Sequence, residues 1–159
     1  MLPSRTQVNY YKVIHAAFDH TIRWVTQGTQ PPAAPSPIQM TTTTPRRAVR
    51  DSYGIASGGI RLDGVDVPVG FNAGWQLGVT AASNSTCQQN GTYIGYLPFE
   101  RQTVILPINA TLSETYTLPS LDELYPANPP SPEQRYDMKV LKSNMDNFRK
   151  GYILKPDIF

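Results

Sequence analysis

Residues 6–32 read TQVNYYKVIHAAFDHTIRWVTQGTQPP, and this stretch decides how the chain must fold. Apolar residues recur in it at helical spacing. At about 100° per residue they fill an arc of roughly half the helix circumference. The arc consists of two neighbouring stripes: Tyr11, Ile14, Phe18, Ile22 and Val25, and Tyr10, Val13, Ala17, Thr21 and Trp24. The pattern predicts an amphipathic helix from about Thr6 to Gln27 that requires a large partner, such as a sheet or several helices.

Both ends of the predicted helix carry suitable residues. Ser4, Thr6 and Asn9 can each cap the N-terminus. At the other end Gly28 adopts positive φ at low cost, and Pro31-Pro32 cannot continue a helix. We therefore expect a sharp end just before Gly28.

A second helix is predicted over residues 131–150. Ser131 caps it, Pro132 takes the first helical position, and Gly151 follows its end. Its apolar stripe is narrow and consists of Met138, Leu141, Met145 and Phe148. The pattern predicts a helix that packs along this stripe.

About a hundred residues of short elements separate the two helices. The pattern predicts an edge strand over 38–44, strands at 48–50 and 55–56 around a turn at Gly54, an alternating strand over 65–69, a loop over 71–78, strands within 93–99 and 102–108, and a helical turn over 121–125. Long connections of this kind argue against a compact domain with its own hydrophobic core.

Composition narrows the possible functions. The chain has 159 residues, 15 of them proline, which is about twice the average usage. Net charge is +2 and charged residues make up 16%, without a basic stripe, so nucleic acid is not an expected partner. No apolar run reaches the roughly 20 residues that span a bilayer.

The stretch 84–111 carries three N-x-S/T sequons, at Asn84, Asn90 and Asn109, which predict a glycosylated surface in a secreted protein. Cys87 is the single cysteine, so it is either a small buried hydrophobe or the half of a disulfide whose partner lies elsewhere. Residues 1–5 lack the apolar core of a signal peptide, so secretion requires a start upstream of Met1.

The sequence patterns that could indicate catalytic residues are weak. Ser57 lies in IASGG, where Ile55 replaces the first glycine of a nucleophile elbow and no helix follows. His15 stands four residues before Asp19, a possible orienting pair, but a structural role for His15 and His20 is the favoured interpretation. We assign no catalytic residue within this chain.

Two carboxylate pairs, Asp63 with Asp66 and Asp122 with Glu123, also occur, at a turn and in a helical first turn. Neither has a groove that the sequence reveals. No Cys/His cluster or glycine-rich phosphate loop is present, so we expect no metal and no cofactor.

Three groups of motifs, in order along nearly the whole chain, resemble the family of large α/β-hydrolase-domain proteins, which are serine-esterase-like. Residues 9–17 (NYYKVIHAA), 23–25 (RWV) and 28–32 (GTQPP) resemble a helix and its exit in that family. Residues 58–62 (GGIRL) with 65–69 (VDVPV), and 124–126 (LYP) with 151–154 (GYIL), resemble its later segments.

The resemblance implies an α/β fold class, as the C-terminal portion of an α/β-hydrolase-type fold. Residues 1–32 would contain the final helix of the core, and residues 33–159 a family-specific extension of short strands, loops and a terminal helix. The triad would lie upstream of Met1, in a missing N-terminal catalytic half that is the expected partner. The expected function is the C-terminal part of a secreted hydrolase of small esters, inactive alone.

Two alternatives remain. The chain could be a complete, non-catalytic, secreted β-rich interaction module, in which case the apolar arc of the first helix must be buried within the chain. It could also be a small autonomous enzyme that uses His15 with Asp19.

Overall fold

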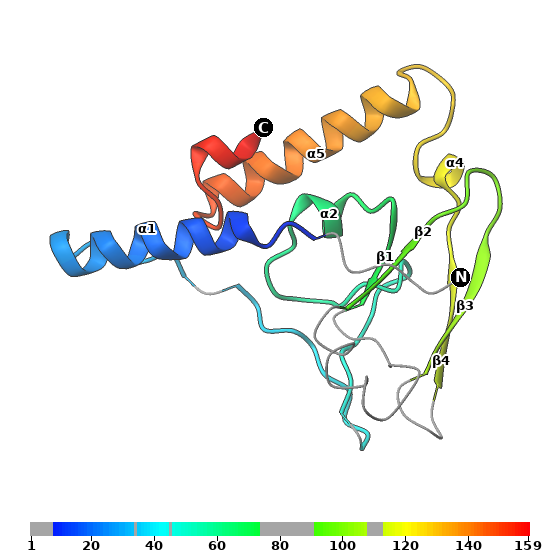
Figure 1. Ribbon diagram of the computed structural model, residues 1–159, viewed down its shortest axis with the longest axis horizontal. Coiled ribbons are helices and arrows are strands. Elements are labelled where there is room, and N and C mark those ends of the chain that lie inside the picture. Colours follow the sequence, from blue (N-terminus) through cyan, green and yellow to red (C-terminus); the bar gives the residue numbers. More distant parts are fainter. Residues whose placement is uncertain (1–7, 34, 45, 74–90, 108–112) are drawn as a thin grey trace.

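The computed structural model describes residues 8–33, 35–44, 46–73, 91–107 and 113–159. The helices and strands are α1 (Tyr11–Gln27), α2 (Asp63–Asp66), β1 (Gly70–Ala73), β2 (Thr92–Gly95), β3 (Gln102–Pro107), β4 (Ser113–Leu118), α4 (Leu121–Leu124), α5 (Pro132–Arg149) and the 3-10 helix η1 (Lys155–Ile158). Figure 1 shows α1 at one end of the molecule and the strands at the other, with α5 running between them.

Helix α1 ends as predicted and begins later than predicted. Gly28 has φ 69° and donates its N–H to Trp24 O at 3.0 Å, which closes the last turn. The helix begins at Tyr11 and not at Thr6. Val8 packs against a buried cluster and accepts a hydrogen bond from Tyr10 N at 3.0 Å, so this segment is held in a turn.

Helix α5 and the short helix α4 agree with their predictions. Ser131 accepts a hydrogen bond from Gln134 N at 3.3 Å, and Pro132 takes the first position of α5. Gly151 follows the helix with φ 77°. Local capping residues therefore set these boundaries correctly.

The sheets are two antiparallel hairpins of two strands each. In the first, β1 pairs with β2 and Phe71 lies opposite Ile94; in the second, β3 pairs with β4 and Val104 lies opposite Tyr116. One buried cluster joins both hairpins: Phe71, Ala73, Tyr96 and Leu118. Two-stranded ribbons are marginal alone, and this shared cluster stabilises them.

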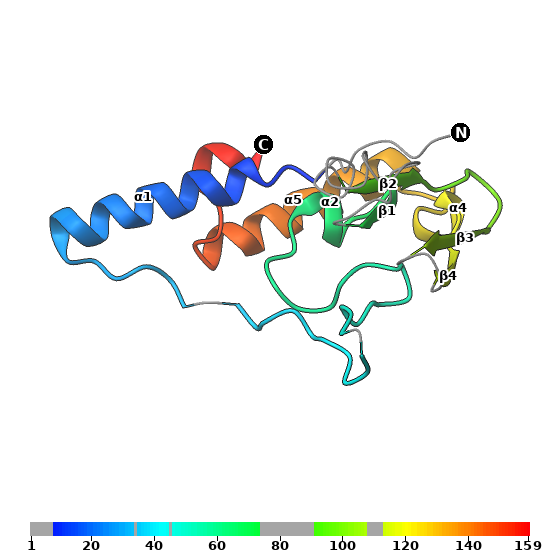
Figure 2. The ribbon, with the colours of Figure 1, turned by 60° about the horizontal axis from the view of Figure 1, so that its bottom comes forward.

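A second buried cluster lies beside the helices and consists of Leu62, Ile153 and Ile158. Val8, Val13 and Met145 pack against it, so it connects α1, α5 and the C-terminal segment. The N-terminal half of α1 thus lies beside the end of the chain, as Figures 1 and 2 both show.

Several predictions for the middle of the chain were wrong. Residues 65 and 66, expected in the strand over 65–69, belong to α2 with Asp63 and Gly64, because Leu62 is extended and Asp63 Oδ1 accepts from Gly64 N at 3.0 Å. Residues 71–73, expected as a loop, lie in β1. The expected edge strand over 38–44 contains a single bridge, Met40 to Ala48. Strand β4 was not predicted at all.

The turn at Gly54 was predicted correctly. Gly54 has φ 73° and lies between the bridged residues Arg50 and Ala56. The described residues are thus mixed α/β with small antiparallel sheets. None of the described helices is both long and apolar enough to cross a membrane.

Candidate functional site

Helix α1 contacts the rest of the described chain mainly through the side opposite its apolar arc, and Val13, at the edge of the arc, also packs against the Leu62 cluster. Lys12 Nζ donates to Asp63 Oδ2 at 3.0 Å, Ala16 is 1% exposed, and His20 Nε2 lies 2.8 Å from Gly151 O. Residues four apart lie on one face of a helix, so these three positions form a single line of attachment.

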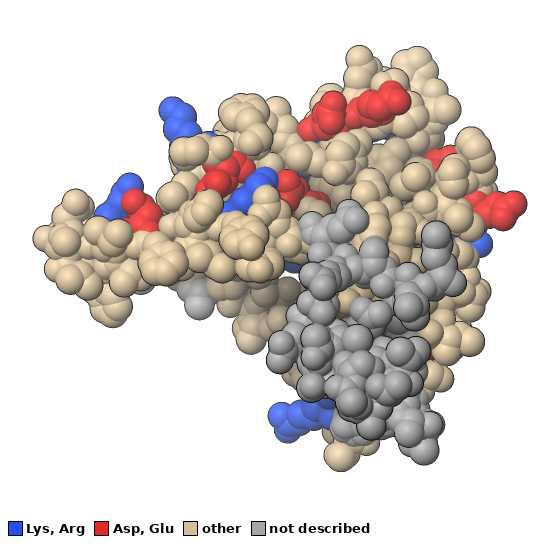
Figure 3. Space-filling model, viewed as in Figure 1, with Lys and Arg blue, Asp and Glu red and all other residues tan. Residues whose placement is uncertain are grey.

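The apolar arc of α1 therefore points outward. Six large side chains define it here, with these exposed fractions: Tyr11 58%, Ile14 39%, Phe18 68%, Ile22 61%, Trp24 55% and Val25 79%. On the face seen in Figure 3, most of the surface of α1 is neither acidic nor basic. A contiguous exposed apolar face of this kind marks an interaction site.

Helix α5 also turns polar residues toward the protein and its apolar stripe toward solvent. Its buried residues are polar: Ser143, Asn144 and Asn147. The predicted packing stripe is mostly exposed, with Met138 at 56% and Leu141 at 42%, so that prediction was wrong for all but Met145.

The buried asparagines of α5 serve as hydrogen-bond donors to the backbone of other segments. Asn144 Nδ2 donates to Ile158 O at 2.9 Å, and Asn147 Nδ2 donates to Arg61 O at 2.9 Å. These bonds satisfy carbonyls that would otherwise be buried without a donor.

Asp63 is the point where α1, α2 and α5 meet. Its Oδ2 accepts from Lys12 Nζ at 3.0 Å and from Asn144 Nδ2 at 3.4 Å. The side chains of Lys12 and Asp63 are only 13% and 20% exposed. Little water reaches this pair, so each charge depends on the other.

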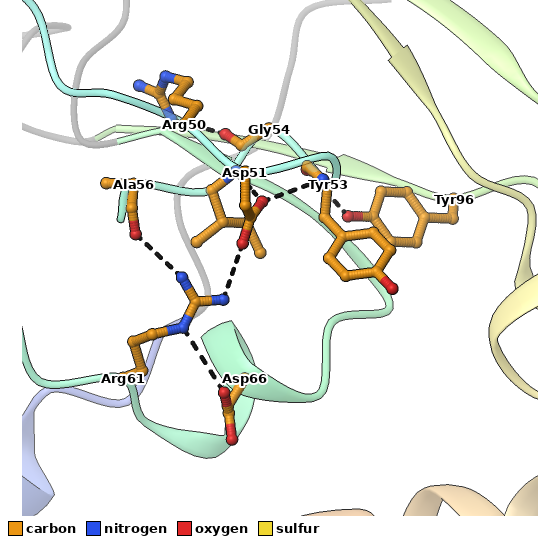
Figure 4. A network of polar contacts seen from close by, with 9 residues as sticks. Arg50, Asp51, Tyr53, Gly54, Ala56, Arg61, Asp66 and Tyr96 are labelled. Atoms are coloured by element: carbon orange, nitrogen blue, oxygen red, sulfur yellow. Dashed lines mark hydrogen bonds and ion pairs between the residues drawn. The ribbon is translucent and has the colours of Figure 1, made fainter. Parts of the chain in front are cut away.

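Arg61, in the GGIRL motif, holds a second polar network (Figure 4). Its Nη1 donates to Ala56 O and its Nη2 to Asp51 Oδ2, both at 3.0 Å, and its Nε lies 3.5 Å from Asp66 Oδ1. The guanidinium therefore ties the 51–56 turn to α2.

The turn itself is closed by Asp51. Its Oδ1 accepts from Tyr53 N and Ile55 N, each at 3.0 Å, and Tyr96 OH donates to Tyr53 O at 3.3 Å. Burial raises the pKa of Tyr96 well above its ordinary value, so its hydroxyl stays protonated and donates. Every part of this network has a structural role.

The residues considered as catalytic candidates, His15, Asp19 and Ser57, are not brought together in the structure. Asp19 pairs with Arg23 at 2.9 Å, and His15 Nδ1 lies 3.5 Å from Asp157 Oδ1, so His15 and Asp19 do not form the orienting pair considered above. Ser57 lies in a bend and donates its backbone N–H to Val49 O at 2.8 Å. Both histidines are on α1, where His20 binds a backbone carbonyl, which agrees with a structural role.

The carboxylate pairs also have structural partners. Asp66 faces Arg61, Glu123 Oε1 accepts from Arg101 Nε at 2.7 Å, and Asp122 accepts from Ser120 Oγ at 2.5 Å. Among the residues that the structure describes, no group of three or more His, Cys, Asp or Glu is placed to hold a metal ion.

The predicted glycosylation sites Asn84, Asn90 and Asn109, and the predicted disulfide residue Cys87, lie outside the described residues. Sequence reasoning missed the role of Asp63. The available signals were Asp63-Gly64, which favours a local cap, and the polar side chains Asn144 and Asn147, three apart on α5.

A comparison with protein-family models matches the alpha/beta hydrolase domain over residues 2–158. This confirms the family and the α/β fold class that the motifs at 9–32, 58–69 and 124–154 implied. Neither the curated proteins nor the solved structures gave a match.

Proposed function

This chain belongs to the alpha/beta hydrolase domain family, and on that premise we propose that it forms the C-terminal part of a secreted serine hydrolase that acts on small esters. The nucleophile, the histidine and the acid would come from the remainder of the parent polypeptide, in the chain order usual for this fold. Acyl transfer from the ester to the serine would be the reaction of the whole protein.

The observation that carries this proposal is the outward direction of the apolar arc of α1. Six large apolar side chains between 39% and 79% exposed are costly in water, at about 25 cal/mol per Å² of apolar surface. The sheet of a hydrolase core is a surface wide enough to cover them. Residues 1–32 would then contain the final helix of that core, with residues 33–159 as the extension beside it.

The proposed location is extracellular, and it rests on sequence. Three sequons within 84–111 support glycosylation of Asn84, Asn90 and Asn109, and an odd cysteine supports a disulfide from Cys87 to the missing half. The alternative, a complete interaction module, requires the arc to be buried by the chain itself, and the exposure of the arc among the described residues favours the hydrolase role.

The first experiment tests whether catalysis is absent from this chain. The purified 159 residues are incubated with a fluorescent serine-reactive phosphonate beside an active serine esterase. We expect labelling of the esterase and none of the chain. Stoichiometric labelling of the chain, abolished by Ser57→Ala, would place the nucleophile here and contradict the proposal.

A second experiment tests the arc. The double variant Phe18→Gln/Ile22→Gln removes two exposed apolar side chains without adding charge. We expect lower binding of an apolar dye and less self-association at unchanged helix content by circular dichroism. Gln27→Asn, at an exposed position on the opposite side of α1, is the matched control and should leave dye binding unchanged. Equal dye binding by all three proteins would contradict an exposed arc.

A further inference from the structure

A groove of about 520 Å³ lies where α4, residues 125–127 and the N-terminal turns of α5 meet. This volume falls within the range of about 300–1,000 Å³ found for small-molecule sites. Most of the wall is apolar and includes Val69, Phe99, Leu121, Tyr125, Pro132 and Tyr136. Phe99 is 81% exposed, so an apolar ligand would find an aromatic surface there that the described residues leave uncovered.

The polar part of the wall is anionic. Asp122 comes from α4, and Glu133 and Asp137 come from α5. No Lys, Arg or His lines the groove within the described part of the chain, and none of these carboxylates forms an ion pair there. Figure 3 shows acidic side chains over the N-terminal half of α5 with no basic side chain beside them.

Two hydroxyl groups contact these carboxylates without neutralising them. Ser120 Oγ donates to Asp122 Oδ1 at 2.5 Å, and Ser131 Oγ donates to Glu133 Oε2 at 3.1 Å. Both carboxylates stand in the first turn of a helix, where the helix dipole offsets part of their charge. Asp137, one turn further along α5, lacks this compensation and makes the largest uncompensated contribution.

The basic side chains nearest along α5 are engaged elsewhere. Arg135 donates to Asn128 Oδ1 at 2.7 Å and to Pro129 O at 2.8 Å. Lys139 Nζ donates to Leu124 O at 3.1 Å and lies 4.8 Å from the centroid of the Tyr125 ring. Neither residue lines the groove, although Lys139 contacts the ring of Tyr125, which does. Since neither cation pairs with a carboxylate of the groove, the negative charge of the groove is available to a ligand.

We propose that this groove binds an organic ammonium ion with an apolar body. The carboxylates would attract the cation, and the Phe99 and Tyr136 rings would cover the apolar part and offer their faces to the charge. This inference stands on the groove alone and does not depend on the hydrolase role.

The test uses the ¹⁵N-labelled 159-residue chain titrated with benzylammonium and, separately, with benzyl alcohol, a neutral molecule of similar size. We expect saturable amide shifts around Asp137 and an affinity for benzylammonium at least about fivefold higher, the effect of a few partly solvated charge contacts. Glu133→Gln/Asp137→Asn should remove this difference and leave the affinity for benzyl alcohol unchanged.

Asp146→Asn is the matched control, since Asp146 is an acidic residue of α5 that pairs with Arg149 away from the groove. It should bind benzylammonium as the unchanged chain does. Equal affinity for the amine and the alcohol would show a merely apolar groove, and an unchanged affinity in the double variant would show that the carboxylates do not recognise the cation. Either result, or the absence of saturable shifts, overturns the proposal.

Discussion

Asp63 shows how much can depend on one carboxylate. It holds Lys12 of α1 and Asn144 of α5, and its second oxygen accepts from Gly64 N, at the start of α2. An exposed ion pair contributes little because water competes for both charges. Here both side chains are mostly buried, so loss of the carboxylate leaves an ammonium without its partner.

Asp63→Ala should therefore lower the free energy of unfolding by about 1–3 kcal/mol, the usual cost of an unsatisfied buried polar group. Asp146→Ala removes an exposed pair with Arg149 and should cost only about 0–1 kcal/mol. Urea unfolding followed by circular dichroism measures both. Equal losses would mean that Asp63 is not a junction between helices.

Tyr116 makes the stability of the folded chain depend on pH. Burial, followed by its hydrogen bond to Glu114, raises the pKa of Tyr116 to about 12. A tyrosine in the unfolded chain titrates near about 10. The folded state holds the phenolic proton more tightly, so this contribution to stability is complete below about pH 10 and is lost as the pH rises through about 12.

Tyr116→Phe should therefore lose less stability than the unchanged chain when urea midpoints are compared at about pH 9 and about pH 11. The raised pKa values of Tyr96 and Tyr125 produce a loss that remains in the variant. Parallel pH profiles for the two proteins would show that Tyr116 does not contribute.

At the scale of elements, the sequence predicted where helices begin and end but not which face of a helix is buried. Ser131, Pro132 and Gly151 correctly delimit α5, since capping needs only neighbouring residues. The inward face of α5 could not be predicted, because the amphipathic rule assumes that apolar stripes pack within the same chain. That assumption fails here, where Asn144 is buried and Met138 is exposed.

The strand-like alternation at 65–69 misled for a related reason. Val65, Val67 and Val69 have the spacing of a strand face, but Asp63 and Leu62 begin a helical turn before them. Among the site residues, the structural roles of His20 and of Asp122 with Glu123 agree with the sequence interpretation. The contacts of Asp63 join positions 51 and 81 apart, beyond the reach of any local pattern.

The turn between the bridged residues 50 and 56 should tolerate a side chain at Gly54 less well than the end of α1 does at Gly28. Gly54 and Gly28 both have positive φ, where alanine costs about 1–2 kcal/mol. A Cβ on Gly28 meets open space, whereas one on Gly54 would lie 2.5 Å from Cε2 of the buried Phe71. Gly54→Ala should therefore destabilise by about 1–3 kcal/mol more than Gly28→Ala, the usual cost of overpacking. Thermal unfolding compares them, and equal melting temperatures would contradict the contact.

At the scale of the whole molecule, the described residues form two small buried clusters and leave the apolar faces of both long helices outside. A protein with little buried apolar surface has little to offset the entropy of folding. The 159-residue chain alone should therefore be marginally stable. A spectroscopic probe on the exposed face of α1 should change little when the chain unfolds, because water already surrounds it in the folded state.

Trp24, 55% exposed, tests this directly. In a Trp75→Phe variant Trp24 is the remaining tryptophan, and we expect its emission maximum to change little on urea unfolding while the helical circular dichroism is lost. Acrylamide should quench it almost equally before and after. A large red shift on unfolding would show that Trp24 is covered in the folded chain.

The attachment of α1 also has a kinetic consequence. His20 meets Gly151 across 131 positions, and His15 faces Asp157. Closing so long a loop is entropically costly, and pairings of this range slow folding. Lys12 can pair with Asp63 earlier, but helix α1 cannot dock completely until residues 151–157 have been synthesised and placed. Docking leaves the apolar arc exposed, so the risk of aggregation begins during synthesis and continues in the folded chain. A chaperone that binds apolar helices would therefore find its substrate in nascent chains of this protein.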